Sequence, residues 1–209
     1  PKVKHLYCFD PSIEALEVAK RNLSNYDNCS FECASINSSA IKENSMDFGY
    51  CLGVLHHLPD TNKALKSCVS KLKKGKPLLV YIYYSLDNKP LWYKLIWQIS
   101  DISRKIISKL PFFLKLFLTK LIAFFIYFPL ARLAFILEKF GFRVSNFPLS
   151  DYRRKSFYLM FTDSLDRFGT RLEKRFSKNE IKKMMQEAGL HKLKFSDQTP
   201  YWVAIGYRI

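Results

Sequence analysis

Residues 47–55 (DFGYCLGVL) are a nearly continuous apolar run that stops at the polar segment HHLPD. Such a short run is typical of a strand in a parallel sheet, because helices cover both faces of such a sheet. Pro59 and Asp60 then begin a helical pattern, which Gly75 ends. These two segments predict a buried strand followed by a helix, whose buried face would be formed by Leu65, Cys68, Val69 and Leu72.

The segments before and after this pair repeat the alternation. Residues 2–10 (KVKHLYCFD) and 30–36 (SFECASI) are predicted strands, and residues 12–25 between them space their apolar side chains as a helix does. Residues 77–84 (PLLVYIYY) are a further predicted strand. Strands that alternate with helices at this spacing predict an α/β fold with a parallel sheet and right-handed crossovers.

The end of the chain has a different pattern. Ser177 and Glu180 have the spacing of a capping box, which predicts the start of a helix that Gly189 ends. Apolar residues then alternate at 193–195 and 203–207, on either side of a turn region that contains Pro200. We therefore predict an antiparallel hairpin at one edge of the sheet.

Residues 86–176 separate the two parts of this core. The segment is rich in Leu, Ile, Phe and Lys and has no strand period, so it predicts an insertion of three or more helices. We therefore divide the chain into an α/β core at residues 1–85, the helical insertion at 86–176, and a closing helix and hairpin at 177–209.

The positive charge of the chain is concentrated in this insertion. The chain has a net charge of +16, and residues 86–176 hold 17 Lys and Arg against 7 Asp and Glu. Such an excess favours an anionic partner, either a phosphorylated substrate, an acidic lipid or a nucleic acid, while plain solubility is the alternative. The predicted strands do not interleave basic and aromatic residues, which argues against a nucleic acid.

The five cysteines indicate free thiols rather than disulfides or a metal site. Their number is odd, and no pair has the Cys-x-x-Cys spacing. We predict no metal ligands, and we expect a reducing, cytoplasmic location.

Two positions at predicted strand ends are candidates for ligand binding. A carboxylate such as Asp10, at the carboxyl end of a strand, can accept both ribose hydroxyls of a nucleotide cofactor, although it would serve equally well as a helix N-cap before Pro11. Gly53 removes a side chain near the end of the strand at 47–55, where ligands bind in open α/β sheets. His56 and His57 follow directly. Adjacent histidines diverge on an extended backbone, so they are poor joint metal ligands, and either a structural hydrogen bond or contact with a ligand remains open.

Four segments, taken in order, resemble class I S-adenosylmethionine-dependent methyltransferases of the type 11 group. The resemblance covers residues 2–84 and 176–209 and implies a Rossmann-like sheet, mostly parallel with a C-terminal antiparallel hairpin. The matching segments are YCFDPS (7–12), SMDF through GVLHHLPD (45–60), LKKGKPLL (72–79) and residues 176–190.

The resemblance implies S-adenosyl-L-methionine as the cofactor and assigns residues to it. Asp10, followed by Pro11, would hold the ribose hydroxyls. His57 would lie near the cofactor or the substrate entrance. The adenine would contact Ala34, Ser35 and Ile36, although many family members have an acid where Ser35 stands. The strand end would approach the cofactor through Leu52, Gly53 and Val54.

The chain departs from the family in lacking the first strand and its glycine-rich loop, so its core is only partial. It has seven glycines and no glycine pair, and Pro1 is followed at once by a strand pattern. We expect this chain to belong to a larger fold, with lost cofactor binding as the alternative. We also expect the sheet to be exposed where the central strand is absent.

The apolar part of the insertion, residues 106–137, leaves two interpretations open. Its longest uninterrupted apolar run, Leu121–Ala131, has 11 residues, whereas a spanning helix needs roughly 20. Lys115, Lys120 and Arg132 interrupt the surrounding pattern. The sequence therefore argues against a transmembrane helix and favours either a helical lid over the active site or a basic amphipathic helix on a membrane surface.

The predicted acceptor site combines arginines with aromatic residues. Arg153 and Arg167, with the neighbouring Arg154, could grip a phosphate or carboxylate, although surface ion pairs explain them equally well. His56 or His57 would be the catalytic base, followed by Asp166. The remaining predicted substrate contacts are Tyr84, Tyr152, Asp166 and Tyr201.

These observations predict methyl transfer from S-adenosyl-L-methionine to a small or lipid-linked acceptor of anionic character, with peripheral membrane contact. The alternative is a non-catalytic basic scaffold that binds a membrane surface or a protein partner.

Overall fold

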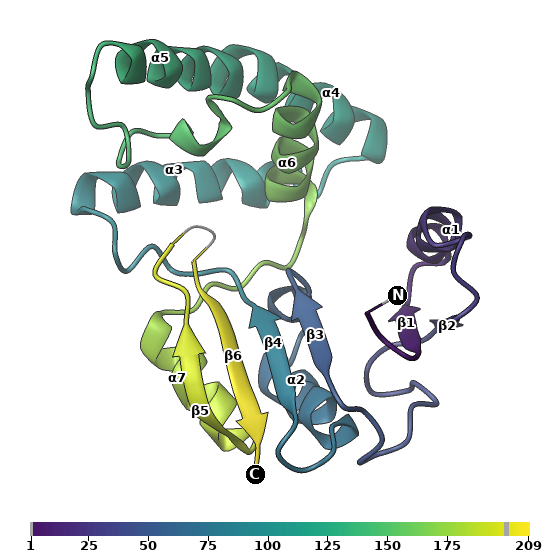
Figure 1. The fold of residues 1–209 in the computed structure, drawn as a ribbon. Coiled ribbons are helices and arrows are strands. Elements are labelled where there is room, and N and C mark those ends of the chain that lie inside the picture. The colour runs from purple at the N-terminus through teal and green to yellow at the C-terminus, as the bar shows by residue number, and fades with distance from the viewer. Residues whose placement is uncertain (1, 199–200) are drawn as a thin grey trace. The chain divides into compact units, whose positions relative to one another are not determined.

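A computed structural model describes residues 2–198 and 201–209 (Figure 1). The chain divides into two compact units. The first, named here the α/β unit, consists of Pro1–Ser85 and Lys174–Ile209, and the second, named the helical unit, consists of Leu86–Glu173. The turn predicted around Pro200 lies outside the described residues.

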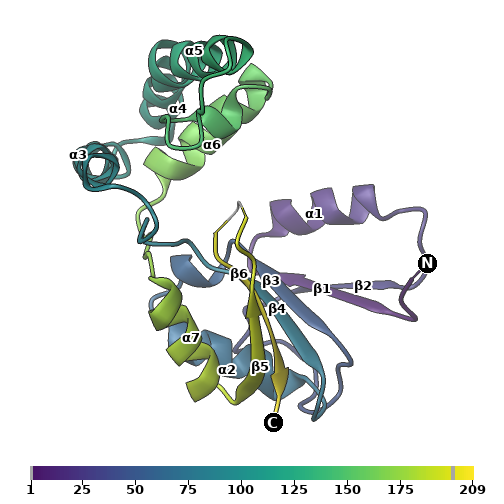
Figure 2. The ribbon, with the colours of Figure 1, turned by 60° about the vertical axis from the view of Figure 1, so that its left-hand side comes forward.

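The strands of the α/β unit form two sheets (Figure 2). In the first, β1 (Leu6–Asp10) pairs in parallel with β2 (Cys29–Cys33), and α1 (Ile13–Asn22) connects them. The second has the order β3-β4-β6-β5, in which β3 and β4 are parallel and β6 is antiparallel to both neighbours. The α/β class and the C-terminal antiparallel hairpin are therefore as predicted. The bounds of this sheet are β3 (Gly49–Leu52), β4 (Pro77–Tyr81), β5 (Leu190–Phe195) and β6 (Val203–Arg208).

The predicted single sheet is instead divided between β1 and β3. Within the described residues, β1 pairs only with β2, and β3 pairs at its side only with β4. Tyr7 on β1 and Tyr50 on β3 are each about half exposed. The division falls where the sequence predicts exposure, because no central strand joins the two halves.

The apolar run at 47–55 is a shorter strand than predicted and is buried on one face only. Gly53 adopts a φ of 75°, which a side chain would disfavour, so β3 ends at Leu52, and the short helix η1 (Leu55–His57) follows. The helices α2 (Thr61–Lys71) and α7 (Lys178–Glu187) pack against each other on one side of the sheet (Figure 2). Leu52 therefore stays half exposed, whereas Val80 on β4 is fully buried.

Both helices begin as the sequence predicts. The Asp60 carboxylate accepts a hydrogen bond from the Lys63 N–H at 2.9 Å and caps α2. Ser177 and Glu180 form the predicted capping box of α7. The core between the helices and the sheet is formed mainly by Leu65, Val80, Ile82, Ile181, Met185 and Leu190.

The helical unit contains α3 (Leu91–Ile107), α6 (Phe157–Gly169) and one long helix between them (Figure 1). The long helix runs without a break over Phe112–Lys139, and its parts are α4 (Phe112–Ile122), the π-helical turn η2 (Ala123–Tyr127) and α5 (Phe128–Lys139). A short turn, η3 (Ser150–Tyr152), follows. The helix α6 packs against α3, α4 and η2, with Met160 at the centre of a small core.

The long helix differs from the interrupted pattern that the sequence predicts. Pro129 lies in the first turn of α5, where a proline is tolerated, and the π-helical turn precedes it. By length and composition, Phe112–Lys139 is the single helix among the described residues that is long and apolar enough to cross a membrane.

Candidate functional site

The Asp10 carboxylate lies at the carboxyl end of β1, in the turn before α1. Its Oδ1 accepts a hydrogen bond from the Ser12 N–H at 2.8 Å. Ser12, rather than Asp10, is the N-cap of α1, because its hydroxyl accepts from the Ala15 N–H at 3.2 Å. Ser12 therefore takes the helix-capping role that was the alternative to ligand binding by Asp10. The turn holds the Asp10 carboxylate in a fixed position.

The residues predicted to contact the adenine follow β2. The Ala34 N–H donates to the Asp10 carbonyl at 3.2 Å, so this segment lies directly beside the end of β1. The Ser35 N–H donates to the Ser38 hydroxyl at 3.1 Å, and the Ile36 side chain is buried in the hydrophobic core. The backbone thus brings Asp10 and Ala34 together, whereas Ile36 contributes to packing, and the cofactor contacts of all three stay predictions.

The end of β3 is open. The Gly53 N–H donates to the Tyr81 carbonyl at 3.0 Å, and a Cβ at Gly53 would come no nearer than 4.0 Å to the Tyr81 ring. Its flanking side chains, Leu52 and Val54, are about half exposed. Gly53 is therefore needed for its backbone conformation rather than for close packing.

His56 is completely buried, unlike a typical catalytic base. Its ring stacks on Tyr83 with the centroids 3.7 Å apart, and its Nδ1 accepts a hydrogen bond from the Tyr83 N–H at 3.4 Å. Burial, followed by the charges of His57 and Arg175, lowers the pKa of His56 to about 3. His56 is therefore neutral and weakly basic at ordinary pH, which favours His57 for proton transfer.

Two residues around His56 were not predicted. Tyr83 stacks on it, and the Arg175 guanidinium lies 5.2 Å from the centre of the Tyr83 ring. The period of the strand could have indicated Tyr83, since Tyr81 and Tyr83 alternate with buried residues and their rings are 5.6 Å apart. No local pattern predicts this position for Arg175, because the whole helical unit separates it from Tyr83 in the sequence.

We expect the α/β unit to lose about 2 kcal/mol of unfolding free energy between pH 7 and pH 5 because of His56. The unfolded chain protonates this residue below its ordinary pKa of 6.5, whereas the folded chain does so only near 3, so stability falls as the pH falls. Urea denaturation across this pH range measures the loss. His56→Asn should remove it and His5→Asn, at an exposed position, should not. The same pH dependence in His56→Asn would contradict this account.

The predicted substrate residues of the α/β unit lie together. The ring centroids of Tyr84 and Tyr201 are 5.4 Å apart, and Trp202 lies 6.4 Å from Tyr84. The Tyr84 carbonyl accepts a hydrogen bond from Arg175 at 3.2 Å. This aromatic cluster joins two segments that are far apart in the sequence, and its contact with a substrate stays a prediction.

The predicted substrate residues of the helical unit make internal contacts. Arg153 and Arg154 donate to the two carboxylate oxygens of Glu138 at 2.8 and 2.9 Å, and these hydrogen bonds lower the pKa of Glu138 to about 2. The Tyr152 ring packs edge-on against Tyr127, and Asp166 is exposed. The Glu138 carboxylate therefore holds the guanidinium groups of Arg153 and Arg154 in place.

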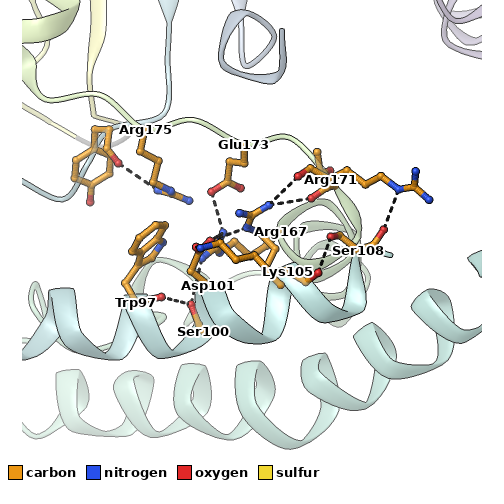
Figure 3. Close-up of polar contacts among 12 residues, drawn as sticks. Trp97, Ser100, Asp101, Lys105, Ser108, Arg167, Arg171, Glu173 and Arg175 are labelled. Atoms are coloured by element: carbon orange, nitrogen blue, oxygen red, sulfur yellow. Dashed lines mark hydrogen bonds and ion pairs between the residues drawn. The ribbon is translucent and has the colours of Figure 1, made fainter. Parts of the chain in front are cut away.

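Arg167 lies at the centre of a buried network of charges (Figure 3). Its Nη1 is 2.8 Å from the Glu173 carboxylate and 3.6 Å from Asp101, and its guanidinium lies 4.8 Å from the centre of the Trp97 ring. Asp101 also accepts from Arg104 at 2.7 Å. Burial alone would raise the pKa of Asp101, but Arg104 and the other cations lower it overall. Such a network holds α3, α6 and the end of the unit together.

Comparisons with known proteins agree with the observed fold. Residues 1–80 match a family model described as a methyltransferase domain. A comparison with curated proteins gives no match.

Several solved structures share the fold. An S-adenosylmethionine-dependent methyltransferase from Thermotoga maritima is 14% identical, with a TM-score of 0.50, and the match covers 98% of this chain and 73% of that one. A methyltransferase from Bacillus halodurans is 14% identical, with a TM-score of 0.51 and coverage of 93% and 57%. A chain of the Haloferax volcanii complex between the Trm112 methyltransferase activator and a methyltransferase is 12% identical, with a TM-score of 0.52 and coverage of 98% and 72%.

Proposed function

We propose that the protein transfers a methyl group from S-adenosyl-L-methionine to a small or lipid-linked acceptor of anionic character, because residues 1–80 match a methyltransferase domain and the fold is shared with solved methyltransferases. The acceptor class rests on the charge and the apolar surface of the helical unit. The five cysteines are free thiols, which supports a cytoplasmic location.

The observation that carries the proposal is the position of Asp10. One carboxylate oxygen is held by the Ser12 N–H, so the group is oriented at the carboxyl end of a strand. Two hydroxyls of a ribose can donate to such a carboxylate, and charge-assisted hydrogen bonds of this kind are roughly twice as strong as neutral ones. Asp10 therefore fits the ribose of S-adenosyl-L-methionine.

The other residues fit the cofactor in part. Ala34 lies beside Asp10, and the open backbone at Gly53 leaves room for a ligand near Leu52. The described residues contain no glycine-rich loop for the methionine end. When bound, the cofactor supplies a methyl group on a positively charged sulfur, so the protein has chiefly to orient the acceptor and exclude water.

His57 is the proposed base where the acceptor carries a hydroxyl or an amine. It is partly exposed at the end of η1, and its ring is 4.0 Å from the buried, neutral ring of His56. His56 would act through this contact as a positioning residue, because its lowered pKa makes it a poor proton acceptor.

Replacing Arg153 and Arg154 together by Gln is expected to raise the KM for an anionic acceptor about tenfold or more, since each charge-assisted hydrogen bond contributes about 1.5–3 kcal/mol. Glu138→Gln is the matched control, because it removes the partner of both arginines and should lower the KM or leave it unchanged. Steady-state kinetics measure both. An unchanged KM in the double variant would remove these arginines from the acceptor site.

A methylation assay with radiolabelled cofactor tests the proposed function. The full-length protein is incubated with an aqueous metabolite extract or with a lipid extract, and the label is followed into the aqueous or the organic phase. We expect label in an acceptor, and Asp10→Ala should abolish it. No label from either extract, with a folded protein, would favour the alternative of a non-catalytic scaffold.

A further inference from the structure

The helix α3 has its apolar side turned away from the helical unit. Leu91, Leu95, Ile99, Ile102 and Ile106 follow one another at helical spacing along one stripe, and each is 58–82% exposed. Surface helices of globular proteins normally bury this stripe. The side of α3 that faces the unit carries the charged pair Asp101 and Arg104 together with the core residue Ile107.

The long helix repeats this arrangement with aromatic side chains. Only a narrow stripe of it is buried, which includes Thr119, Ala123, Ala131 and Ala134. The exposed apolar side chains outnumber these and lie along the whole length of the helix, at Phe112, Phe113, Phe117, Phe124, Phe125 and Ile136. Monomeric proteins rarely expose apolar surface on this scale, so a partner must cover it.

The charge of the helical unit identifies the partner. Residues 86–173 carry 15 Lys and Arg against 7 Asp and Glu. Lys109 and Arg143 are exposed just beyond the C-terminal ends of the two apolar helices, and Lys120 is exposed within the long helix. Exposed Leu, Ile and Phe beside cations match a bilayer interface with anionic headgroups, where apolar side chains enter the acyl boundary and cations meet phosphate.

From these observations we propose that the helical unit docks on the surface of a bilayer that contains anionic phospholipids, through the apolar sides of α3 and of the helix Phe112–Lys139. The docking is peripheral. The long helix is packed against α6, which carries Asp163, Asp166 and Arg167, so crossing the membrane would either bring these charges into hydrocarbon or separate the two helices. The proposal does not rest on methyl transfer.

Vesicle flotation of the full-length protein, without cofactor, tests the proposal. We expect binding to vesicles of phosphatidylcholine with about 30 mol% phosphatidylglycerol and at least tenfold weaker binding to phosphatidylcholine alone. Replacing Ile99, Ile102 and Ile106 by Gln should weaken binding to the anionic vesicles at least tenfold. Ile13→Gln with Val18→Gln, an exposed apolar pair on α1 of the α/β unit, is the matched control and should bind as the unchanged protein does.

A charge variant keeps the proposal testable even if the Ile variant fails to fold. Replacing Lys109, Lys120 and Arg143 by Glu should weaken anionic vesicle binding roughly 100-fold and remove its dependence on salt. Failure of the unchanged protein to bind either vesicle would overturn the proposal, as would equal binding by all variants. A variant that loses cofactor binding or self-association, but keeps vesicle binding, would show that the apolar surface covers the α/β unit or a second copy instead.

Discussion

Replacing Arg167 by Met is expected to lower the free energy of unfolding of the helical unit by about 3–5 kcal/mol. The side chain of Glu173 is only 1% exposed and lies 2.8 Å from the Arg167 guanidinium. Removing the arginine takes away the cation 2.8 Å from this buried carboxylate, and removing one partner of a buried ion pair is strongly destabilising. The contact between Arg167 and Trp97 would be lost as well.

Urea denaturation followed by circular dichroism measures this effect. The double variant Arg167→Met with Glu173→Leu should recover much of the loss, because it removes both charges together. Lys183→Ala breaks an exposed ion pair with Glu187 and should cost about 0–1 kcal/mol. A loss below about 1 kcal/mol for Arg167→Met would contradict a structural role for the network and favour its use in binding an acceptor.

Replacing Asp10 by Asn is expected to weaken binding of S-adenosylhomocysteine at least about 100-fold, as two charge-assisted hydrogen bonds contribute about 1.5–3 kcal/mol each. The amide oxygen of Asn can still accept from the Ser12 N–H, so the turn before α1 should keep its structure. The change therefore removes the negative charge without removing the turn.

The matched control is Asp27→Asn, at an exposed position of the loop before β2. It should leave both the affinity and the melting temperature unchanged. If Asp10→Asn weakens binding and also lowers the melting temperature, the role of Asp10 is structural. If it changes neither, Asp10 does not hold the ribose.

The α/β class, the parallel pairings and the C-terminal hairpin were predictable because each rests on a local pattern. The capping box at Ser177 and Glu180 and the N-cap at Asp60 are of this kind, since side chain and backbone partner lie within one turn. The place of Asp10 at the end of a strand was predictable for the same reason, while its role stays a prediction. Its competing role as a cap could not be excluded from sequence, because Ser12 two residues later is an equally good cap.

The contacts that decide the role of each charged residue were not predictable. Arg167 pairs with Glu173, which is close to it in the sequence, and also with Asp101 of a different helix. The burial of His56 depends on its contact with Tyr83, which follows β4 and lies 27 residues away in the sequence, so the spacing around His56 does not reveal it. Periodicity shows that α3 is amphipathic but not which side faces the unit, because the inward side is set by the ion pair between Asp101 of α3 and Arg167 of α6.

Cofactor binding by this chain is tested by calorimetric titration of S-adenosylhomocysteine into the full-length protein that contains these residues. We expect saturable binding with one site per chain, which Asp10→Asn weakens and Asp27→Asn leaves unchanged. If a protein that circular dichroism shows to be folded gives no heat of binding, the chain is a methyltransferase fold without the activity.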